Sequence, residues 1–142
     1  MGYRIRYKDR SVVISGDTRK SAAVARESKG ADLLVHEALS PVLLSMLERG
    51  FGTAGRAKLS KIMHDVLDYH TTPDEAAEIA QAAGVRALVL NHIVPPLPTS
   101  GLHPVFLQRA GQIYPGPLRI GADGDWFSLP AGSTTVTMGR RP

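Results

Sequence analysis

The sequence predicts an α/β fold in which short strands form a mixed sheet with covering helices. The central segments follow the order strand, helix, strand, helices and strand. These strands are short, continuous apolar runs, which is typical of sheets covered on both faces. With 142 residues, of which 43% are hydrophobic and 21% are charged, the chain has the size and composition of one globular domain or part of one.

The first segment predicts a β-hairpin followed by a helix. Residues 3–7 (YRIRY) alternate between apolar and charged side chains, which is the period of a half-buried strand. Residues 11–15 form a second strand after a tight turn. A helix is expected from Arg19 to about Lys29, with Thr18 as its N-cap and Gly30 as its stop.

The middle of the chain predicts another strand and two helices around a loop. Residues 31–38 (ADLLVHEA) contain a short apolar run, and a short helix is expected over 41–49. The glycine-rich residues 50–58 (GFGTAGRAK) predict a loop or lid. Residues 59–70 (LSKIMHDVLDYH) carry apolar side chains at helical spacing.

The best-marked helix begins after Thr72. Thr72 and Glu75 have the spacing of a capping box, Pro73 suits the first turn, and Gly84 is expected to end the helix. The elements expected beyond it are a buried strand over 85–91, a short helix near 105–112, and strands near 118–120 and 126–129.

We expect one domain over residues 1–130 and a flexible tail over 131–142, because the residues after Pro130 are small and polar. The chain has no apolar run of 18 residues and no signal-peptide pattern, so neither a membrane segment nor secretion is expected. A cytoplasmic location is the default expectation. The net charge of +4 comes from scattered basic residues, which allow a phosphate-rich partner without requiring one.

Ionisable side chains follow three of the predicted strands at the points where the strands end. Asp17 follows the first apolar run, the pair His36-Glu37 ends the second, and His92 ends the third; His70 precedes the capped helix. Functional residues of α/β sheets collect at the carboxyl ends of strands, so these segments are expected to meet at one edge. Taken singly, each has a structural explanation: a helix N-cap for the carboxylates, and a core or surface position for the histidines.

The absence of cysteine restricts the chemistry at this edge. It excludes disulfides, thiolate ligands and thiol catalysis, so a metal would be held by His, Asp or Glu. A carboxylate at a strand exit can bridge two cations, and a Glu–His pair can hold a proton for a leaving group. His70 precedes Thr71 and Thr72 at a helix N-terminus, where backbone N–H groups attract anions, so both threonines are expected to bind substrate.

Five segments carry a family resemblance: SGDT at 15–18, ADLLVHEA at 31–38, YHTTPDEAAEIAQAAGV at 69–85, LVLNHIVPP at 88–96 and GADGDWFSLP at 121–130. Together they make the sequence similar to metallo-β-lactamase-fold hydrolases. It most closely resembles the branch that contains ribonuclease Z and the arylsulfatase-like phosphodiesterases. The segments occur in the order and at the spacing familiar from that family, and the resemblance covers nearly the whole chain.

The resemblance implies a role for each residue of the predicted edge. Asp17 would be the carboxylate that bridges two zinc ions, and His92 would be the last metal-ligand histidine. Glu37 and His70 would position the scissile phosphate and supply the proton for the leaving group. In such enzymes a water activated by two cations attacks the phosphorus.

The sequence departs from the family at its main metal-binding motif. No HxHxDH occurs among the five histidines, and only two predicted strands precede SGDT. The chain therefore resembles only the C-terminal half of a four-layer αββα sandwich. Its two ligands, Asp17 and His92, are too few for a tight zinc site, because zinc takes three or four protein ligands. We expect the zinc site of this chain alone to be incomplete or absent.

A half-sandwich would leave one face of its sheet exposed. Burying apolar surface contributes roughly 25 cal/mol per Å² to stability, so leaving several hundred Å² exposed to water loses on the order of 10 kcal/mol. This loss is comparable to the stability of a whole domain. The partner expected on this face is the missing N-terminal half or a second copy of the chain, which would make a homodimer. A third possibility is a degenerate, metal-free relative.

Two functions are compatible with these observations. In the first, the chain is the C-terminal portion of a zinc-dependent hydrolase that acts on phosphodiester or related ester bonds, with RNA or a small phosphodiester as substrate. In the alternative, the chain is a non-catalytic protein or pseudoenzyme. It would then self-associate through its exposed sheet and bind little or no metal.

Overall fold

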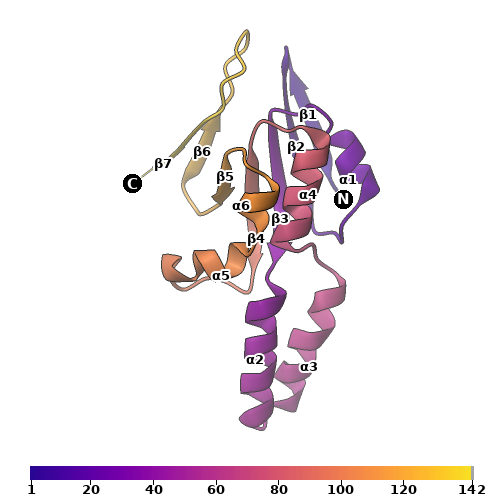
Figure 1. The fold of residues 1–142 in the computed structure, drawn as a ribbon, viewed down its shortest axis with the longest axis vertical. Helices are drawn as coiled ribbons and strands as arrows, with labels where there is room; N and C mark the ends of the chain where they lie inside the picture. The colour runs from indigo at the N-terminus through magenta and orange to yellow at the C-terminus, as the bar shows by residue number, and fades with distance from the viewer. Residues whose placement is uncertain (142) are drawn as a thin grey trace.

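A five-stranded mixed sheet forms the centre of the structure, a computed structural model that describes residues 1–141. The strand order is β1-β2-β3-β4-β5; β1 is antiparallel to β2 and the other neighbours are parallel (Figure 1). The carboxyl ends of β2, β3 and β4 therefore lie at the same edge. The strands are β1 (Tyr3–Tyr7), β2 (Arg10–Ile14), β3 (Leu33–Leu39), β4 (Leu88–Val94) and β5 (Leu118–Ile120).

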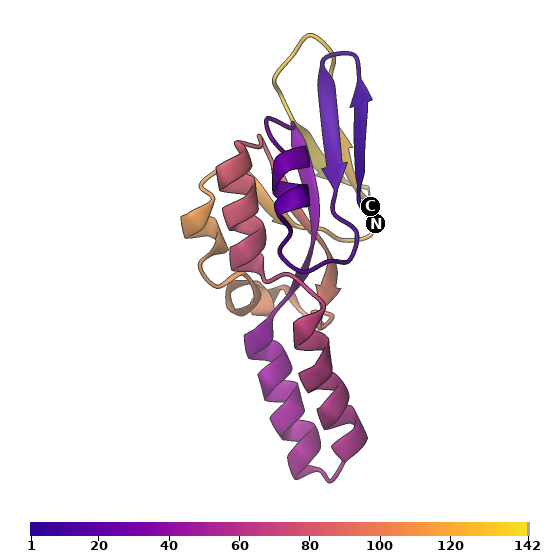
Figure 2. The ribbon, with the colours of Figure 1, turned by 90° about the vertical axis from the view of Figure 1, so that its right-hand side faces the viewer.

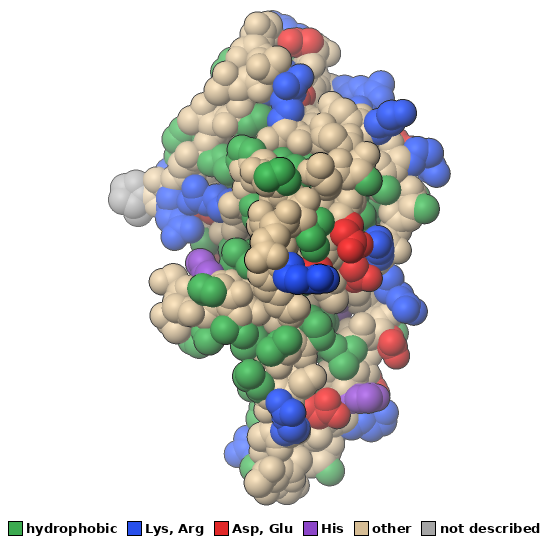
Figure 3. All heavy atoms as spheres, viewed as in Figure 1, with side chains coloured by type: hydrophobic (Ala, Val, Ile, Leu, Met, Phe, Trp, Pro, Cys, Tyr) green, Lys and Arg blue, Asp and Glu red, His purple; other side chains and the backbone are tan. Residues whose placement is uncertain are grey.

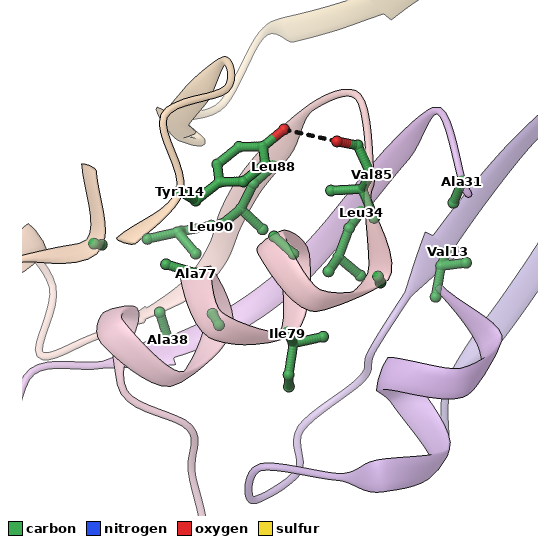
Figure 4. Packing of buried hydrophobic residues seen from close by; sticks show 14 of the residues in the cluster. Val13, Ala31, Leu34, Ala38, Ala77, Ile79, Val85, Leu88, Leu90 and Tyr114 are labelled. Carbon is green, nitrogen blue, oxygen red and sulfur yellow. Dashed lines mark hydrogen bonds between the residues drawn. The ribbon is translucent and has the colours of Figure 1, made fainter. Parts of the chain in front are cut away.

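Helices cover one face of this sheet and form the main core with it (Figure 2). Leu34, Leu88 and Leu90 from the strands pack with Ala77 and Ile79 of α4, and each of these side chains is buried (Figure 4). Burying one leucine contributes roughly 1.5–3 kcal/mol, so this layer is a major source of stability. The helices of this face are α1 (Ala22–Glu27), α4 (Pro73–Ala83), α5 (His103–Leu107) and α6 (Ala110–Ile113).

The N-terminus of α4 has the caps that the sequence predicts. The Thr72 hydroxyl accepts from the Glu75 backbone N–H at 3.2 Å, and the Glu75 carboxylate accepts from the Thr72 backbone N–H at 2.9 Å. Gly84 ends the helix with φ of +62°, in the left-handed region that favours glycine. The capping box fixes the entry of α4 and therefore the loop residues immediately before it.

The helix α1 is shorter than predicted. It begins at Ala22 with Ser21 as its N-cap, whereas we expected a start at Arg19 with Thr18 as the cap. The correction has a physical reason, because Thr18 is already engaged elsewhere. Its backbone carbonyl accepts the Thr71 hydroxyl at 2.6 Å, which holds it against the loop before α4.

A helical hairpin projects from the body of the molecule, below the sheet in Figure 1. It consists of α2 (Pro41–Thr53) and α3 (Ala57–Asp65), followed by the short 3₁₀ turn η1 (Val66–Asp68). The loop or lid predicted over 50–58 is therefore wrong for most of its length. Only residues 54–56 connect the two helices, and Gly55 makes this turn with φ of +69°.

A second, two-stranded sheet packs on the face opposite the helices. It contains β6 (Asp125–Ser128) and β7 (Thr137–Arg140), and its side chains Phe127 and Met138 pack against Leu33 and Val89 of the main sheet. This hairpin covers part of the face that we expected to be bare.

The residues after Pro130, expected to form a flexible tail, include strand β7, which is paired with β6. The segment that connects β6 to β7 is held by buried Arg10, whose guanidinium donates to the backbone carbonyls of Ser133 and Thr135. Small polar residues alone did not predict this anchoring, since the contact comes from a strand more than 100 residues away.

The remainder of this face carries an exposed apolar stripe on β1. Tyr3, Ile5 and Tyr7 are 61%, 53% and 70% exposed. Tyr3 and Ile5 pair with Ile14 and Val12 of β2, so the stripe lies on the same face as the β6–β7 hairpin. Three large side chains in a row are more than the scattered apolar exposure of an ordinary surface.

On the face seen in Figure 3, Lys and Arg residues are scattered and do not gather into one basic patch. Within residues 1–141, no helix is long and apolar enough to cross a membrane.

Asp125 connects the second sheet to β5. Its carboxylate accepts from the guanidinium groups of Arg140 at 2.8 Å and Arg119 at 2.6 and 2.9 Å, and from the Ala122 backbone N–H at 3.0 Å. These bonds, above all the one from Arg140, lower the pKa of Asp125 from 3.8 to about 2.

We predict that Asp125→Asn lowers the free energy of unfolding at neutral pH and has little effect near pH 2. A carboxylate whose folded-state pKa is depressed contributes stability above its unfolded pKa, 3.8 here, and this contribution is lost as the pH falls toward about 2. Urea denaturation of both proteins across this range measures the difference. An equal difference at both pH values would mean that the charge of Asp125 is not what stabilises the hairpin.

Candidate functional site

A buried carboxylate lies at the carboxyl end of β3. The side chain of Glu37 is 1% exposed, and both of its oxygens are occupied. Oε1 accepts from the Thr71 backbone N–H at 2.7 Å and from the Thr18 backbone N–H at 3.4 Å, while Oε2 lies 3.0 Å from Nδ1 of His70. Glu37 thereby joins β3 to the segment after β2 and to the loop before α4.

Two opposing effects shift the pKa of the Glu37 carboxyl group. Burial raises the pKa of the Glu37 carboxyl, because it removes water from the charged form, while the Thr71 N–H and the neighbouring His70 lower it. Burial is the larger effect. A carboxyl group with a raised pKa beside a histidine suits proton transfer, and such groups are common at functional sites.

His70 presents one ring nitrogen to Glu37 and leaves the other free. A carboxylate accepts hydrogen bonds, so Nδ1 donates to Glu37 and Nε2 remains unprotonated in the neutral ring. The His70 side chain is 13% exposed. The two residues that follow His70 are held in place, because Thr71 bonds to Glu37 and Thr72 caps α4.

Asp17 lies at the exit of β2, on a turn that the sequence builds locally. Gly16 has φ of +63°, and a Cβ on it would lie 2.4 Å from the Met1 carbonyl oxygen, so glycine is required there. The buried hydroxyl of Ser15 accepts from the Glu37 backbone N–H at 3.1 Å. This turn leaves the Asp17 side chain 63% exposed, at the rim of the site.

His92 faces Asp17 from the carboxyl half of β4. Its Nε2 lies 3.7 Å from Oδ2 of Asp17, and its ring centroid lies 5.3 Å from that of His70. The four predicted residues therefore occupy one site as two adjacent pairs, Asp17 with His92 and Glu37 with His70. The simpler role of helix N-cap does not apply to either carboxylate, since Ser21 caps α1 and Ser40 caps α2.

Thr71 and Thr72, expected to bind substrate, both have structural partners. The Thr71 hydroxyl donates to the Thr18 carbonyl, and the Thr72 hydroxyl belongs to the capping box. Substrate binding by these two residues stays a prediction. Sequence analysis missed Ser15, although its position in SGDT, two residues before Asp17, was the available signal.

Two further histidines lie outside this site. His64 lies on the projecting hairpin, 3.3 Å from the Glu48 carboxylate of α2. His103 lines a hollow of about 540 Å³ beyond the end of β5, together with Arg140. Neither contacts the four residues of the predicted edge.

The donors at the rim fit zinc in kind but not in number. Imidazole and carboxylate are the zinc ligands open to a protein without cysteine. Asp17 and His92 supply one of each, and the described residues 1–141 contain no group of three or more candidate metal ligands. These two donors are fewer than the three or four protein ligands that zinc takes.

Comparison with known proteins gives a consistent result. The chain is 32% identical over 123 residues to ribonuclease Z from Mycobacterium sp. (strain KMS), and 36% identical over 125 residues to ribonuclease Z from Myxococcus xanthus (strain DK1622). These matches cover 87% and 85% of this chain but only 39% and 33% of the relatives. No family model matches the chain.

A solved structure has the same fold. The metallo-β-lactamase-fold protein YhfI from Bacillus subtilis superposes with a TM-score of 0.59 at 23% identity, over 97% of this chain and 44% of that protein. The chain thus has the architecture of about half a metallo-β-lactamase-type domain, which confirms the predicted fold class. Over most of its length its sequence is similar to ribonuclease Z, as the five motifs predicted.

We predict that Glu37→Ala destabilises the chain much more than Asp17→Ala. Removing Glu37 leaves the buried Thr71 N–H without its acceptor, at a cost of about 1–3 kcal/mol, in addition to a cavity. Asp17 is exposed and makes only a 3.7 Å contact, so its loss should change stability by less than about 0.5 kcal/mol. Urea denaturation at pH 7 compares the two variants, and similar losses would contradict the distinction between a buried and an open half of the site.

Proposed function

We propose that this chain is the C-terminal part of a zinc-dependent hydrolase that cleaves phosphodiester or related ester bonds. The observation that supports this most strongly is the meeting of the pairs Asp17–His92 and Glu37–His70 at one sheet edge. The similarity to ribonuclease Z makes a phosphodiester the favoured substrate class, either RNA or a small molecule.

In this proposal, Glu37 and His70 act on the leaving group. Glu37 holds the Nδ1–H of His70, so the imidazole keeps one tautomer and one orientation. Once Nε2 of His70 is protonated, it can donate a hydrogen bond to the scissile phosphate and then give its proton to the departing oxygen. The burial of Glu37 keeps water from competing for the bond that orients the ring.

Asp17 and His92 would hold metal at the rim. Nε2 of His92 lies 3.7 Å from Oδ2 of Asp17, so the two side chains that would hold the metal already lie side by side. Bound zinc would supply an acidified water as the nucleophile. In this proposal the remaining ligands come from polypeptide outside residues 1–141, because no group of three or more side chains within that range is placed to hold a metal ion.

The exposed stripe on β1 suggests where the missing ligands come from. Tyr3, Ile5 and Tyr7 lie on the face opposite the helices, and β2 of the same sheet leads into Asp17. A polypeptide that covers this stripe is therefore close to the rim of the site. It would be the N-terminal half of the domain, or a second copy of the chain.

The purified chain tests the proposal through its zinc content, its native mass and its hydrolysis of bis(p-nitrophenyl) phosphate. We expect stoichiometric zinc and hydrolysis only in a complex or dimer, with both lost in His92→Ala. His64→Ala is the matched control, because it removes an exposed histidine on the projecting hairpin, and it should change neither. A metal-free, inactive protein in every assembled form would contradict catalysis by this chain.

A second candidate is a non-catalytic, self-associating protein. The observation that favours it is the exposed apolar stripe together with a two-donor metal site in residues 1–141. Pairing of two copies through this face would bury the stripe without any metal.

We predict that the double variant Ile5→Ser/Tyr7→Ser lowers the native mass from dimer to monomer if the stripe is the interface. Leu59→Ser, which alters a partly exposed leucine on the projecting hairpin, is the control and should leave the mass unchanged. Sedimentation or native mass spectrometry measures the outcome. An unchanged dimer in the double variant would rule out this face as the contact between copies.

A further inference from the structure

The strand β4 contains a β-bulge at His92. Glu37 pairs with Asn91 and Ala38 pairs with Ile93, so His92 has no partner on β3. His92 has φ of +43°, a left-handed conformation that is uncommon for a residue other than glycine. Bulges of this kind occur next to active sites, where they redirect a side chain.

The bulge decides where the His92 side chain goes. In an unbroken strand, alternation would put His92 on the same face as Leu90, which is buried under the helices. Instead, the His92 side chain is 47% exposed and faces Asp17. The pairing of Asp17 with His92 therefore depends on the bulge being formed.

Among residues 1–141, the His36 side chain has one hydrogen-bond partner, and that bond lies at the bulge. Its Nδ1 is 2.8 Å from the backbone carbonyl of Glu37, at the step where the register shifts. A carbonyl only accepts, so Nδ1 carries the proton. Nε2 is buried and has no partner within residues 1–141, and burial lowers the pKa of His36, which favours the neutral ring.

A buried His36 ring whose Nε2 has no partner within residues 1–141 lowers the stability of the folded chain. An unpartnered buried nitrogen acceptor is destabilising, and the His36 side chain is fully buried. An aliphatic side chain would avoid that penalty. What the aliphatic side chain could not supply is a donor for the Glu37 carbonyl.

We infer that His36 is a positioning residue, whose Nδ1–H bond to the Glu37 carbonyl holds the β-bulge that turns His92 toward Asp17. A bulge interrupts the ladder and leaves backbone groups to find other partners. His36 supplies a hydrogen-bond donor for the backbone carbonyl of Glu37. The inference relies on the proposed function only for the roles of Asp17 and His92, and its test measures geometry, not activity.

A matched pair of variants isolates the donor. His36→Asn and His36→Leu remove the same ring and have nearly the same shape, but only asparagine keeps an N–H donor at the place of Nδ1. We expect the nuclear Overhauser effect between the rings of His70 and His92, 5.3 Å apart, to persist in His36→Asn. In His36→Leu it should be lost, and the His92 backbone amide should shift, while signals of Tyr114 in the core stay unchanged.

The same site signals in both variants would overturn the inference, since the donor would then have no effect on His92. If either variant fails to fold, a measurement on the unaltered protein still tests whether His36 donates to the Glu37 carbonyl. The ¹⁵N shifts of the His36 ring distinguish its tautomers, and protonation at Nδ1 is required. Protonation at Nε2 would mean that the bond to the Glu37 carbonyl does not exist. Loss of hydrolysis alone would bear on the proposed function and not on this inference.

Discussion

The buried carboxylate of Glu37 is the constraint on which the site depends. A charged or polar group out of water is costly unless its hydrogen bonds are satisfied. Glu37 satisfies its oxygens with the Thr71 N–H, the Thr18 N–H and the His70 ring. These partners come from two other segments of the chain, so satisfying one carboxylate fixes three segments at a common point. The open pair, Asp17 and His92, can then be assembled around a rigid centre.

A different local feature of the backbone brings each of the other three residues, Asp17, His92 and His70, to the site around Glu37. After β2, the left-handed Gly16 turns the chain so that Asp17 stands at the rim. In β4, the bulge exposes His92, which would otherwise face the helices. Before α4, the capping box of Thr72 sets the direction from which His70 arrives. The pair Glu37 and His70 is thus largely buried, whereas the pair Asp17 and His92 is open to solvent.

The local signals in the sequence predicted much of this arrangement. The arrival of Asp17, Glu37 and His92 at one sheet edge followed from short apolar runs, and the α4 cap followed from residue spacing. The predicted strand ends were wrong for Glu37 and His92, because β3 and β4 each continue for two residues beyond them. The departures have non-local causes. Thr18 is not a cap because its backbone binds Glu37 and Thr71, and the segment after Pro130 is ordered by Arg10 and β6. Contacts of that kind join residues far apart in the chain, and single-sequence patterns do not encode them.

Hydrogen exchange at the Thr71 amide tests the central claim most directly. If Glu37 is the buried acceptor that joins these segments, the Thr71 N–H should exchange as slowly as core amides such as Leu90. In Glu37→Ala the protection at Thr71 should fall selectively, while the core amides of β4 stay protected. Fast exchange at Thr71 in the unaltered protein, alongside a protected core, would show that the carboxylate does not hold this loop and that the site is not assembled around it.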